Sequence, residues 1–182
     1  MQGDVNRLID DFIAEVRALP VQSTSPVRRL RRELSKSLAT YPPAAVYAAA
    51  HRLIDAELRW VGYEVVREHP TAINAIRLKE VTALGKGMAA WDHVDTFACF
   101  VSGPAWRKGR ISDTAVLRWT CSPDRWWRRA ALVTTVPLNV KNQGGTGDPT
   151  QTLAVCSKLV SDRDDMVVKG LSWALRCLVP HD

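Results

Sequence analysis

Residues 126–138 read WWRRAALVTTVPL, and this segment is one of four that decide the fold of the chain. Within it Ala130, Val133 and Pro137 follow one another at the spacing of a single helical face. Three further apolar segments begin at residues 58 (LRWVGYEVVREH), 91 (WDHVDTFACFVSG) and 168 (VKGLSWALRCLVP), so neighbouring segments start 33 to 42 residues apart. Each of the four apolar segments is preceded by a further segment with helical periodicity, and this arrangement indicates helices that recur in pairs.

Helical periodicity covers nearly the whole chain, and the alternation typical of strands is almost absent. The pattern predicts helices over residues 3–19, 26–39, 43–51, 52–68, 71–86, 90–102, 111–120, 123–137, 149–160 and 164–178. Recurring pairs of this length are typical of HEAT-like solenoids. We therefore expect an all-α fold, an α-α superhelix of HEAT-like helical pairs with a concave basic face, forming one domain over residues 1–182.

The 182 residues carry 25 Lys and Arg against 19 Asp and Glu, a formal net charge of +6. A basic surface favours phosphate-bearing partners, although such arginines can also simply solvate helix faces. No stretch approaches the ~20 apolar residues that span a membrane. The first residues alternate charged and apolar side chains at helical spacing, unlike a signal peptide, so we expect a cytoplasmic protein.

The cysteines and histidines give no sign of a metal site. Both kinds are scattered along the chain, without a C-x-x-C pair or metal-ligand spacing. We therefore expect no metal and no cofactor, and buried reduced thiols at Cys99, Cys121, Cys156 and Cys177 are favoured over disulfides. The glycine-rich residues 139–149 lack the Lys-Ser/Thr ending of a phosphate-binding loop, and we interpret them as a flexible turn between helices.

Trp91 and Asp95 are four residues apart, which makes them neighbours on one flank of a predicted helix, while Asp92 points elsewhere. Taken alone, such a tryptophan is more often a core residue, and such an aspartate is more often a surface residue. Arg128 and Arg129 follow on the next apolar helix and point about 100° apart, so they cannot both be buried. One of them is expected to reach the concave face, with a salt bridge as the alternative.

Trp173 lies between two cations on one helical face, with Lys169 four residues before it and Arg176 three residues after it. A core position and a ligand-facing position are equally compatible with this pattern. Three motifs in this order, AAWDHVDTF, DRWWRRAAL and VKGLSWALR, resemble those of the AlkD-type DNA alkylation repair family of HEAT-like repeat alkylpurine DNA glycosylases. The resemblance covers most of the chain and is strongest from Trp91 onward.

The resemblance implies specific roles for the residues that match. Trp91 and Asp95 would be the active-site pair, Arg129 the contact to the DNA backbone and Trp173 the second aromatic of the catalytic site. Their basic neighbours Arg128, Lys169 and Arg176 would add contacts to DNA. Relatives usually continue through at least one more helical pair, so this chain is expected to lack that pair and to expose an apolar face at its last helices.

The implied reaction is the hydrolysis of the N-glycosidic bond of cationic N3- or N7-alkylated purines in double-stranded DNA. The family acts without flipping the base into a pocket, and we expect a monomer without a membrane partner. Asp95 would stabilise the oxocarbenium-like sugar and position the attacking water. Two alternatives remain open: a non-catalytic HEAT-type module that binds DNA or protein, and a helical scaffold for an acidic protein.

Overall fold

The computed structural model describes residues 2–21 and 23–179, and every regular element in these two ranges is a helix. The prediction of an all-α chain is confirmed. The chain divides after Ala75 into two compact units, and each is described by itself below. Within the described residues, no helix combines the length and the apolar character needed to cross a membrane. The grouping of residues 1–182 into one domain stays a prediction.

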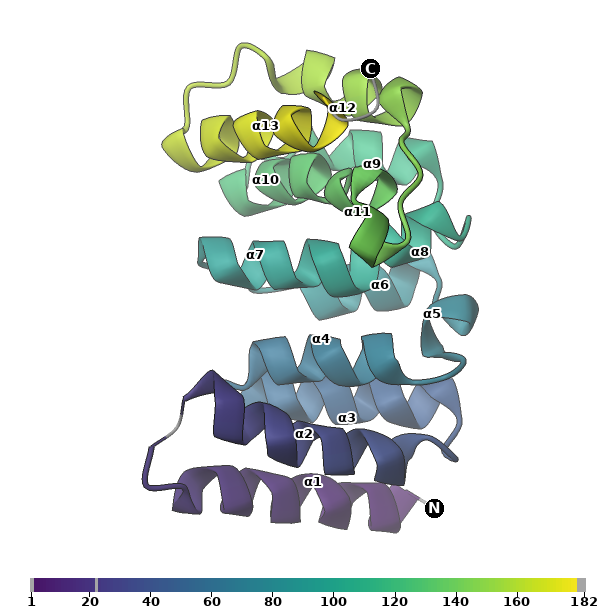
Figure 1. Cartoon of the computed structure of the whole chain (residues 1–182), viewed down its shortest axis with the longest axis vertical. Coiled ribbons are helices and arrows are strands. Elements are labelled where there is room, and N and C mark those ends of the chain that lie inside the picture. The colour runs from purple at the N-terminus through teal and green to yellow at the C-terminus, as the bar shows by residue number, and fades with distance from the viewer. Residues whose placement is uncertain (1, 22, 180–182) are drawn as a thin grey trace. The chain divides into compact units, whose positions relative to one another are not determined.

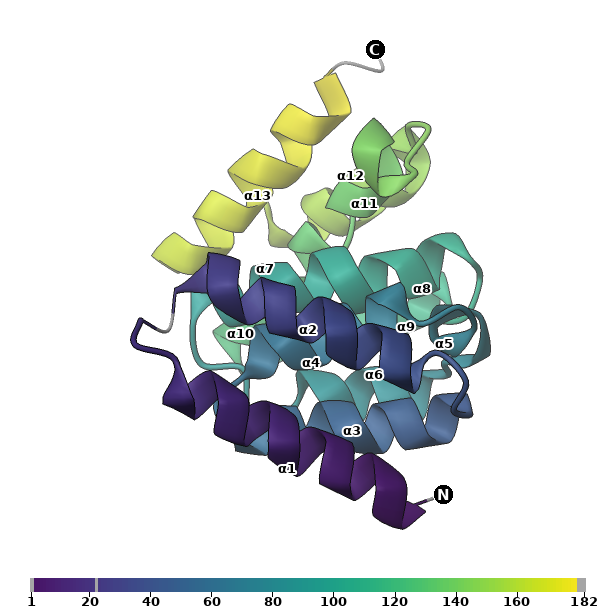
Figure 2. The same ribbon diagram turned by 60° about the horizontal axis from the view of Figure 1, so that its bottom comes forward.

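Unit 1 contains five helices in its described part: α1 (Gln2–Ala18), α2 (Thr24–Leu38), α3 (Pro43–Asp55), α4 (Arg59–Glu68) and α5 (Ala72–Ala75). Helix α1 packs against α2 and α3, and α4 packs against α2 and α3 (Figures 1 and 2). The interior is formed by buried side chains from α1, α2, α3 and α4, among them Ile9, Leu38, Leu53 and Tyr63. The apolar periodicity of the sequence therefore has its expected physical cause, which is burial of one face of each helix.

The junction predicted between residues 51 and 52 is wrong, because α3 continues to Asp55 and the turn lies at residues 56–58. There the backbone amides of Glu57 and Leu58 donate to the carbonyls of Ile54 and Leu53 and close the end of the helix. This arrangement requires a left-handed residue after the helix, and Glu57 takes that conformation at φ 64°. Glycine is the usual residue at such a position, so the sequence carried no signal for the turn.

Unit 2 contains α6 (Leu78–Gly85), α7 (Trp91–Phe97), α8 (Gly103–Arg107), α9 (Asp113–Trp119), α10 (Arg125–Val133), α11 (Val136–Asn139), α12 (Pro149–Leu159) and α13 (Asp165–Leu178). Helix α7 packs against α10, and α10 packs against α13, so these three helices are stacked in order (Figure 1). Their partners are α6 for α7, α9 for α10 and α12 for α13. The recurring pairs expected from the sequence are present, and α7, α10 and α13 carry every candidate site residue.

The predicted helix over residues 90–102 does not end at Gly103-Pro104. A π-helical turn at Ala98–Ser102 follows α7, and the helical backbone then continues into α8. Pro104 has no backbone N–H for a regular helical bond, and the widened turn accommodates that loss, with the Gly103 amide donating to the carbonyl of Ala98. Pro104 therefore lies in the first turn of the next helical segment, and the helix predicted to end at residue 102 continues past it.

Gly103 also permits a close approach between α8 and α11, and this contact yields a prediction. A Cβ atom at Gly103 would lie 2.5 Å from the Cγ atom of Pro137 and 2.8 Å from the Ala98 carbonyl oxygen. We expect Gly103→Ala to lower the free energy of unfolding by about 1–3 kcal/mol, since neither neighbour is a flexible side-chain end. Urea denaturation would measure this loss of stability. Gly109→Ala serves as the comparison, because Gly109 has a left-handed backbone and a Cβ atom there would meet no other atom within 4 Å. An unchanged stability in Gly103→Ala would contradict this interpretation of the turn.

The glycine-rich residues 139–149 form an anchored loop. Asn139 is buried, and its side-chain amide donates to the Thr135 carbonyl and the Thr152 hydroxyl. The Asn139 side-chain oxygen accepts from the Asp148 amide. These bonds join the end of α11 to the start of α12, so the loop has a defined path between the two helices.

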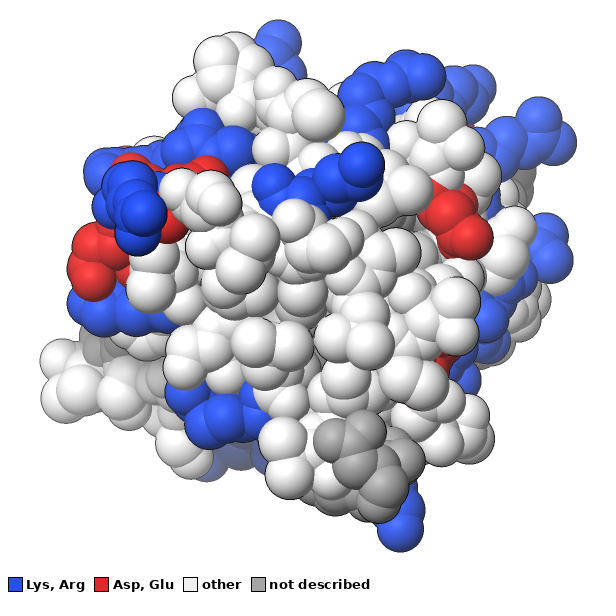
Figure 3. Space-filling view, turned by 90° about the horizontal axis from the view of Figure 1, so that it is seen from above, with Lys and Arg blue, Asp and Glu red and all other residues white. Residues whose placement is uncertain are grey.

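The last two described helices expose apolar side chains, as the sequence led us to expect. Figure 3, which looks onto the end of unit 2 formed by α12 and α13, shows a surface that is largely uncharged, with Lys and Arg distributed over and around it. The exposed apolar residues of these helices and their ends are Leu153, Val160, Val168, Leu175 and Val179.

Candidate active site

Helix α7 presents Trp91 and Asp95 as neighbours on successive turns. Trp91 begins the helix and its surface is 58% exposed, which is unusual for so large an apolar side chain. Asp95 lies four residues on, and its side chain is only 16% exposed. Asp92 is exposed, so the helix separates the two aspartates as the spacing predicted. The packing of Val94 and Phe97 into the interior fixes this orientation.

Arg129 of α10 binds the Asp95 carboxylate with two parallel hydrogen bonds. Its Nε and Nη2 atoms donate to the two Asp95 oxygens, both at 2.9 Å. The Arg129 side chain is 7% exposed, so the ion pair lies largely out of solvent. A bidentate contact of this kind fixes the carboxylate in position as well as neutralising it. Of the two adjacent arginines, Arg129 is therefore the one that reaches Asp95.

Helix α13 completes the support of this ion pair through backbone features. The remaining Arg129 terminal nitrogen, Nη1, donates to the carbonyl oxygen of Met166 at 2.7 Å. Gly170 leaves room for the arginine, since a Cβ atom there would lie 3.3 Å from its Cγ atom. Sequence reasoning missed both residues. A carbonyl contact leaves no residue-type signal, but a glycine inside a helix is a sign of close packing that could have drawn attention to Gly170.

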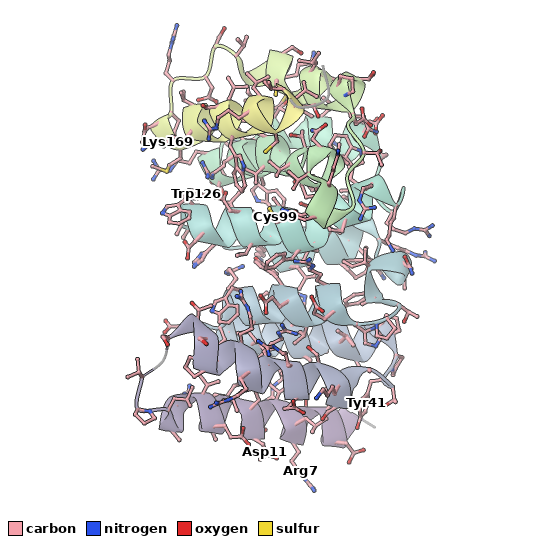
Figure 4. The ribbon with its side chains drawn as sticks, viewed as in Figure 1. Arg7, Asp11, Tyr41, Cys99, Trp126 and Lys169 are labelled. Atoms are coloured by element: carbon pink, nitrogen blue, oxygen red, sulfur yellow. The ribbon has the colours of Figure 1, made fainter. Side chains whose placement is uncertain are left out.

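A surface hollow with a volume of about 330 Å³ opens beside the ion pair. It is lined by Trp91, Arg129, Met166 and Lys169, so all three stacked helices contribute to it. Lys169 makes an exposed ion pair with Asp165 at 2.7 Å. Figure 4 shows that Lys169 and Trp126 lie toward the same end of unit 2, where α10 and α13 begin. The hollow thus combines an exposed aromatic ring, an ammonium group and the Arg129 side chain, while Asp95 does not line it and is connected to it through Arg129.

The electrostatic environment of Asp95 has opposing effects on its ionisation. Burial raises the pKa of the Asp95 carboxyl above the ordinary aspartate value, while the hydrogen bonds and charge of Arg129 act in the opposite direction. The charge of nearby Asp92 adds a small upward effect on the same pKa. A partly desolvated carboxylate of this kind is a characteristic of catalytic sites.

Trp173 of α13 is partly buried, and it packs against a cluster formed by Ala98, Cys99, Val133 and Val136. Burial raises the pKa of the Cys177 thiol, and a hydrogen bond with Trp173 opposes that shift. Trp173 is not among the residues that line the hollow, and its assignment to the catalytic site stays a prediction.

The remaining basic candidates have local partners. Arg128 donates to Asp162 at 2.7 Å and to the carbonyls of Ser122 and Pro123, so it joins the start of α10 to the turn between α12 and α13. Arg176 is exposed and donates to the Ser172 hydroxyl on its own helix. Arg128 thus follows the salt-bridge alternative, whereas Lys169 and Arg176 remain on the surface, where phosphate contacts are sterically possible.

The two adjacent tryptophans of α10 have different surroundings. Trp127 packs its ring against Phe97 and Trp119 while it stays partly exposed. Trp126 is partly exposed and carries the Arg125 guanidinium over its ring. None of the four cysteines forms a disulfide, and Cys121 is exposed, although all four thiols were expected to be buried. Among residues 2–21 and 23–179 no group of three or more His, Cys, Asp or Glu side chains is arranged to hold a metal ion.

Comparison with known proteins identifies one family. A family model described as DNA alkylation repair enzyme matches residues 12–182, a range that includes all of the site residues above. The chain matches no curated protein and no solved structure.

Proposed function

The chain belongs to the DNA alkylation repair enzyme family, and we propose that it is a DNA glycosylase that hydrolyses the N-glycosidic bond of cationic N3- or N7-alkylated purines in double-stranded DNA. Membership of the family indicates a role in the repair of alkylated DNA. The observation that supports the glycosylase proposal is the carboxylate of Asp95, which is clamped by Arg129, a residue that lines the surface hollow together with the exposed ring of Trp91.

The chemistry of an alkylated purine matches such a site. A purine alkylated at N3 or N7 is positively charged and leaves as a neutral base, so its departure needs no general acid. The sugar left behind has oxocarbenium-like character, and a nearby carboxylate stabilises that charge. Asp95 would supply the charge and would accept a hydrogen bond from the attacking water. No pocket for a flipped base is needed for this scheme.

A second tryptophan–carboxylate pair, in unit 1, supports the idea that this pattern holds a cation. Trp60 and Glu64 on α4 have the same four-residue spacing as Trp91 and Asp95. The Arg28 guanidinium lies 5.4 Å from the Trp60 ring centre and donates to Glu64 at 2.8 Å. A planar cation thus rests on the indole face and the carboxylate together. At Trp91, the exposed ring is open to a cation that arrives from outside.

The other residues take supporting roles in this proposal. Arg129 is a positioning residue that holds Asp95 in a single orientation through its bidentate contact. Its place in the wall of the hollow also allows its unused N–H groups to meet a phosphate flanking the lesion. Lys169 and Arg176 would contact the DNA backbone, and Trp173 would support the wall of the site from the interior.

The direct test is release of free base from alkylated DNA. Double-stranded DNA that contains 7-methylguanine or 3-methyladenine is incubated with the protein, and the released bases are quantified by chromatography. Release above the rate of spontaneous depurination is the expected result. Failure to release any cationic base, by a protein that still binds the DNA, would favour the non-catalytic binding module instead.

The pH dependence of base release follows from the environment of Asp95. Only the ionised carboxylate stabilises the sugar, so activity should fall as the pH drops through the pKa of Asp95, which burial raises. The acid limb should therefore lie at higher pH than an ordinary aspartate would give. The free energy of unfolding responds to pH in the opposite sense. Because folding raises the pKa of Asp95, this carboxyl stabilises the fold most when it is protonated, and that stabilisation is lost as the pH rises through the pKa of Asp95 in the folded protein.

Single-turnover rates between about pH 4 and pH 8 would measure this limb, after subtraction of the spontaneous rate in the same buffers. Asp95→Glu serves as the comparison, since it keeps a carboxylate but changes its burial. A rate that is flat through the acid range would contradict the assignment of Asp95 as the group that must be ionised.

A further inference from the structure

We propose that unit 2 carries a second binding site, in an apolar hollow lined by α6, α9 and the start of α10, and that this site takes a small amphipathic anion. The hollow has a volume of about 760 Å³. Pockets for small organic ligands lie in the range of roughly 300–1,000 Å³ and are mostly apolar with a few polar groups. Nothing in the glycosylase proposal uses this hollow.

The hollow is bounded by two indole rings and small apolar side chains. Trp119 and Trp127 line one part of it, and Leu78, Ala83 and Ala115 line the rest of the apolar wall. Trp127 is partly exposed in this hollow, whereas Trp119 is buried apart from the small area that borders it. A flat aromatic or alkyl body would gain from burial against such a surface.

The aromatic wall is held in place by the interior of unit 2. The rings of Trp119 and Trp127 lie 5.0 Å apart, and Trp127 meets Phe97 edge-on at 5.9 Å. Gly85 makes space for this arrangement, since a Cβ atom there would lie 2.6 Å from the Trp127 ring. The hollow is therefore formed before any ligand arrives, which reduces the entropy cost of binding.

The charge of the lining selects an anion. Three basic residues, Lys79, Lys86 and Arg118, take part in it, and none of the described residues that line it is acidic. Only Thr82 and Ser122 add side-chain hydroxyl groups. So few hydrogen-bonding groups suit neither a sugar nor the polar edge of a nucleobase. An apolar body with a single carboxylate, sulfonate or phosphate fits both the apolar wall and the cations.

This hollow is distinct from the candidate active site. No residue is shared between the linings of the two. On α10, Trp127 and Arg129 are two residues apart, so they point about 200° apart around the helix. Substitutions in the apolar hollow therefore leave the contacts of Asp95 and Arg129 in place, and the proposal can be tested independently of base release.

The test uses 8-anilinonaphthalene-1-sulfonate, an aromatic anion that fluoresces when its surroundings are apolar. We expect saturable binding of one molecule per chain, with energy transfer from tryptophan, and competition by decanoate. Ala83→Trp should abolish binding, because Ala83 is exposed on α6 and a larger side chain there fills the hollow without entering the core. Unchanged probe affinity in Ala83→Trp would overturn the proposal.

Charge is tested by Arg118→Glu, which should raise the dissociation constant of the probe about tenfold. Arg163→Glu is the matched control, since Arg163 is an exposed arginine outside the hollow, and its effect should stay within about twofold. The neutral analogue N-phenyl-1-naphthylamine should bind more weakly than the sulfonate. If Arg118→Glu and Arg163→Glu changed the dissociation constant of the probe equally, or if the neutral analogue bound as tightly as the sulfonate, the site would not select anions. Either result would overturn the proposal that the ligand is an anion.

Cys121 provides an independent measure of occupancy, because this exposed thiol belongs to the lining of the hollow. Bound decanoate should slow its reaction with a thiol reagent, and Ala83→Trp should remove that protection. A thiol that reacts at the same rate with and without saturating decanoate would contradict the proposal. An acidic peptide that protects Cys121 where decanoate fails would indicate a protein partner in place of a small anion.

Discussion

Asp95→Asn is expected to slow the release of alkylated purines by about 10²–10³-fold, the loss typical when one preorganised electrostatic contact to a transition state is removed. Asparagine keeps the size of the side chain but not its charge, and the developing positive charge on the sugar then has no counter-charge in the site. Single-turnover measurements on DNA containing 7-methylguanine would give the rate of the chemical step. Affinity for alkylated DNA should change far less than this rate.

Asp92→Asn is the matched control for this variant, since it removes the same charge from the same helix at an exposed position. It should retain base release within about twofold of the wild-type rate. If Asp95→Asn released base at the wild-type rate, the proposed mechanism would be wrong even though the family is established. If both variants lost activity equally, general electrostatics of the surface, and not the position of Asp95, would be responsible.

Arg129→Ala is expected to lower the free energy of unfolding by about 3–5 kcal/mol, because it leaves the Asp95 carboxylate largely buried without its cation. Burial then acts unopposed, and the pKa of Asp95 should rise further. Thermal or urea denaturation would measure the loss of stability. The acid limb of base release should move to higher pH in any variant that stays folded.

Lys169→Ala is the control, because Lys169 also makes an ion pair at 2.7 Å, but with both partners exposed. It should cost at most a few tenths of a kcal/mol. A double variant, Asp95→Leu with Arg129→Met, removes both charges and should recover most of the stability lost in Arg129→Ala without restoring base release. A stable Arg129→Ala variant would indicate that the carboxylate finds another partner or enough water.

Much of the fold could be predicted because burial on one helical face leaves a 3.6-residue period in the sequence. The paired helices of unit 2 and most helix positions followed from it. The end of α3 could not be located, since Glu57 occupies a left-handed position that usually carries glycine. The continuation through Gly103 and Pro104 was likewise hidden, because proline fits the start of a helical segment as well as the end of one.

The candidate site was predicted in part. The four-residue spacing made Trp91 and Asp95 neighbours, and the resemblance to the repair family singled out Arg129. The bond between Arg129 and Asp95 joins residues 34 positions apart and depends on how α10 packs against α7. The position of α12 and α13 on α10 decides that Arg128 binds Asp162 and that Trp173 is partly buried.

The sequence by itself determined that the chain is helical, that its helices recur in pairs, and that one tryptophan and one carboxylate are neighbours on one face of α7. These properties are local, because they follow from spacing along a single helix. Only the tertiary structure decided which cation the carboxylate meets and how far that pair is removed from water. Those properties depend on contacts between α7, α10 and α13, and the contacts are set by interhelical packing that no spacing within one helix encodes.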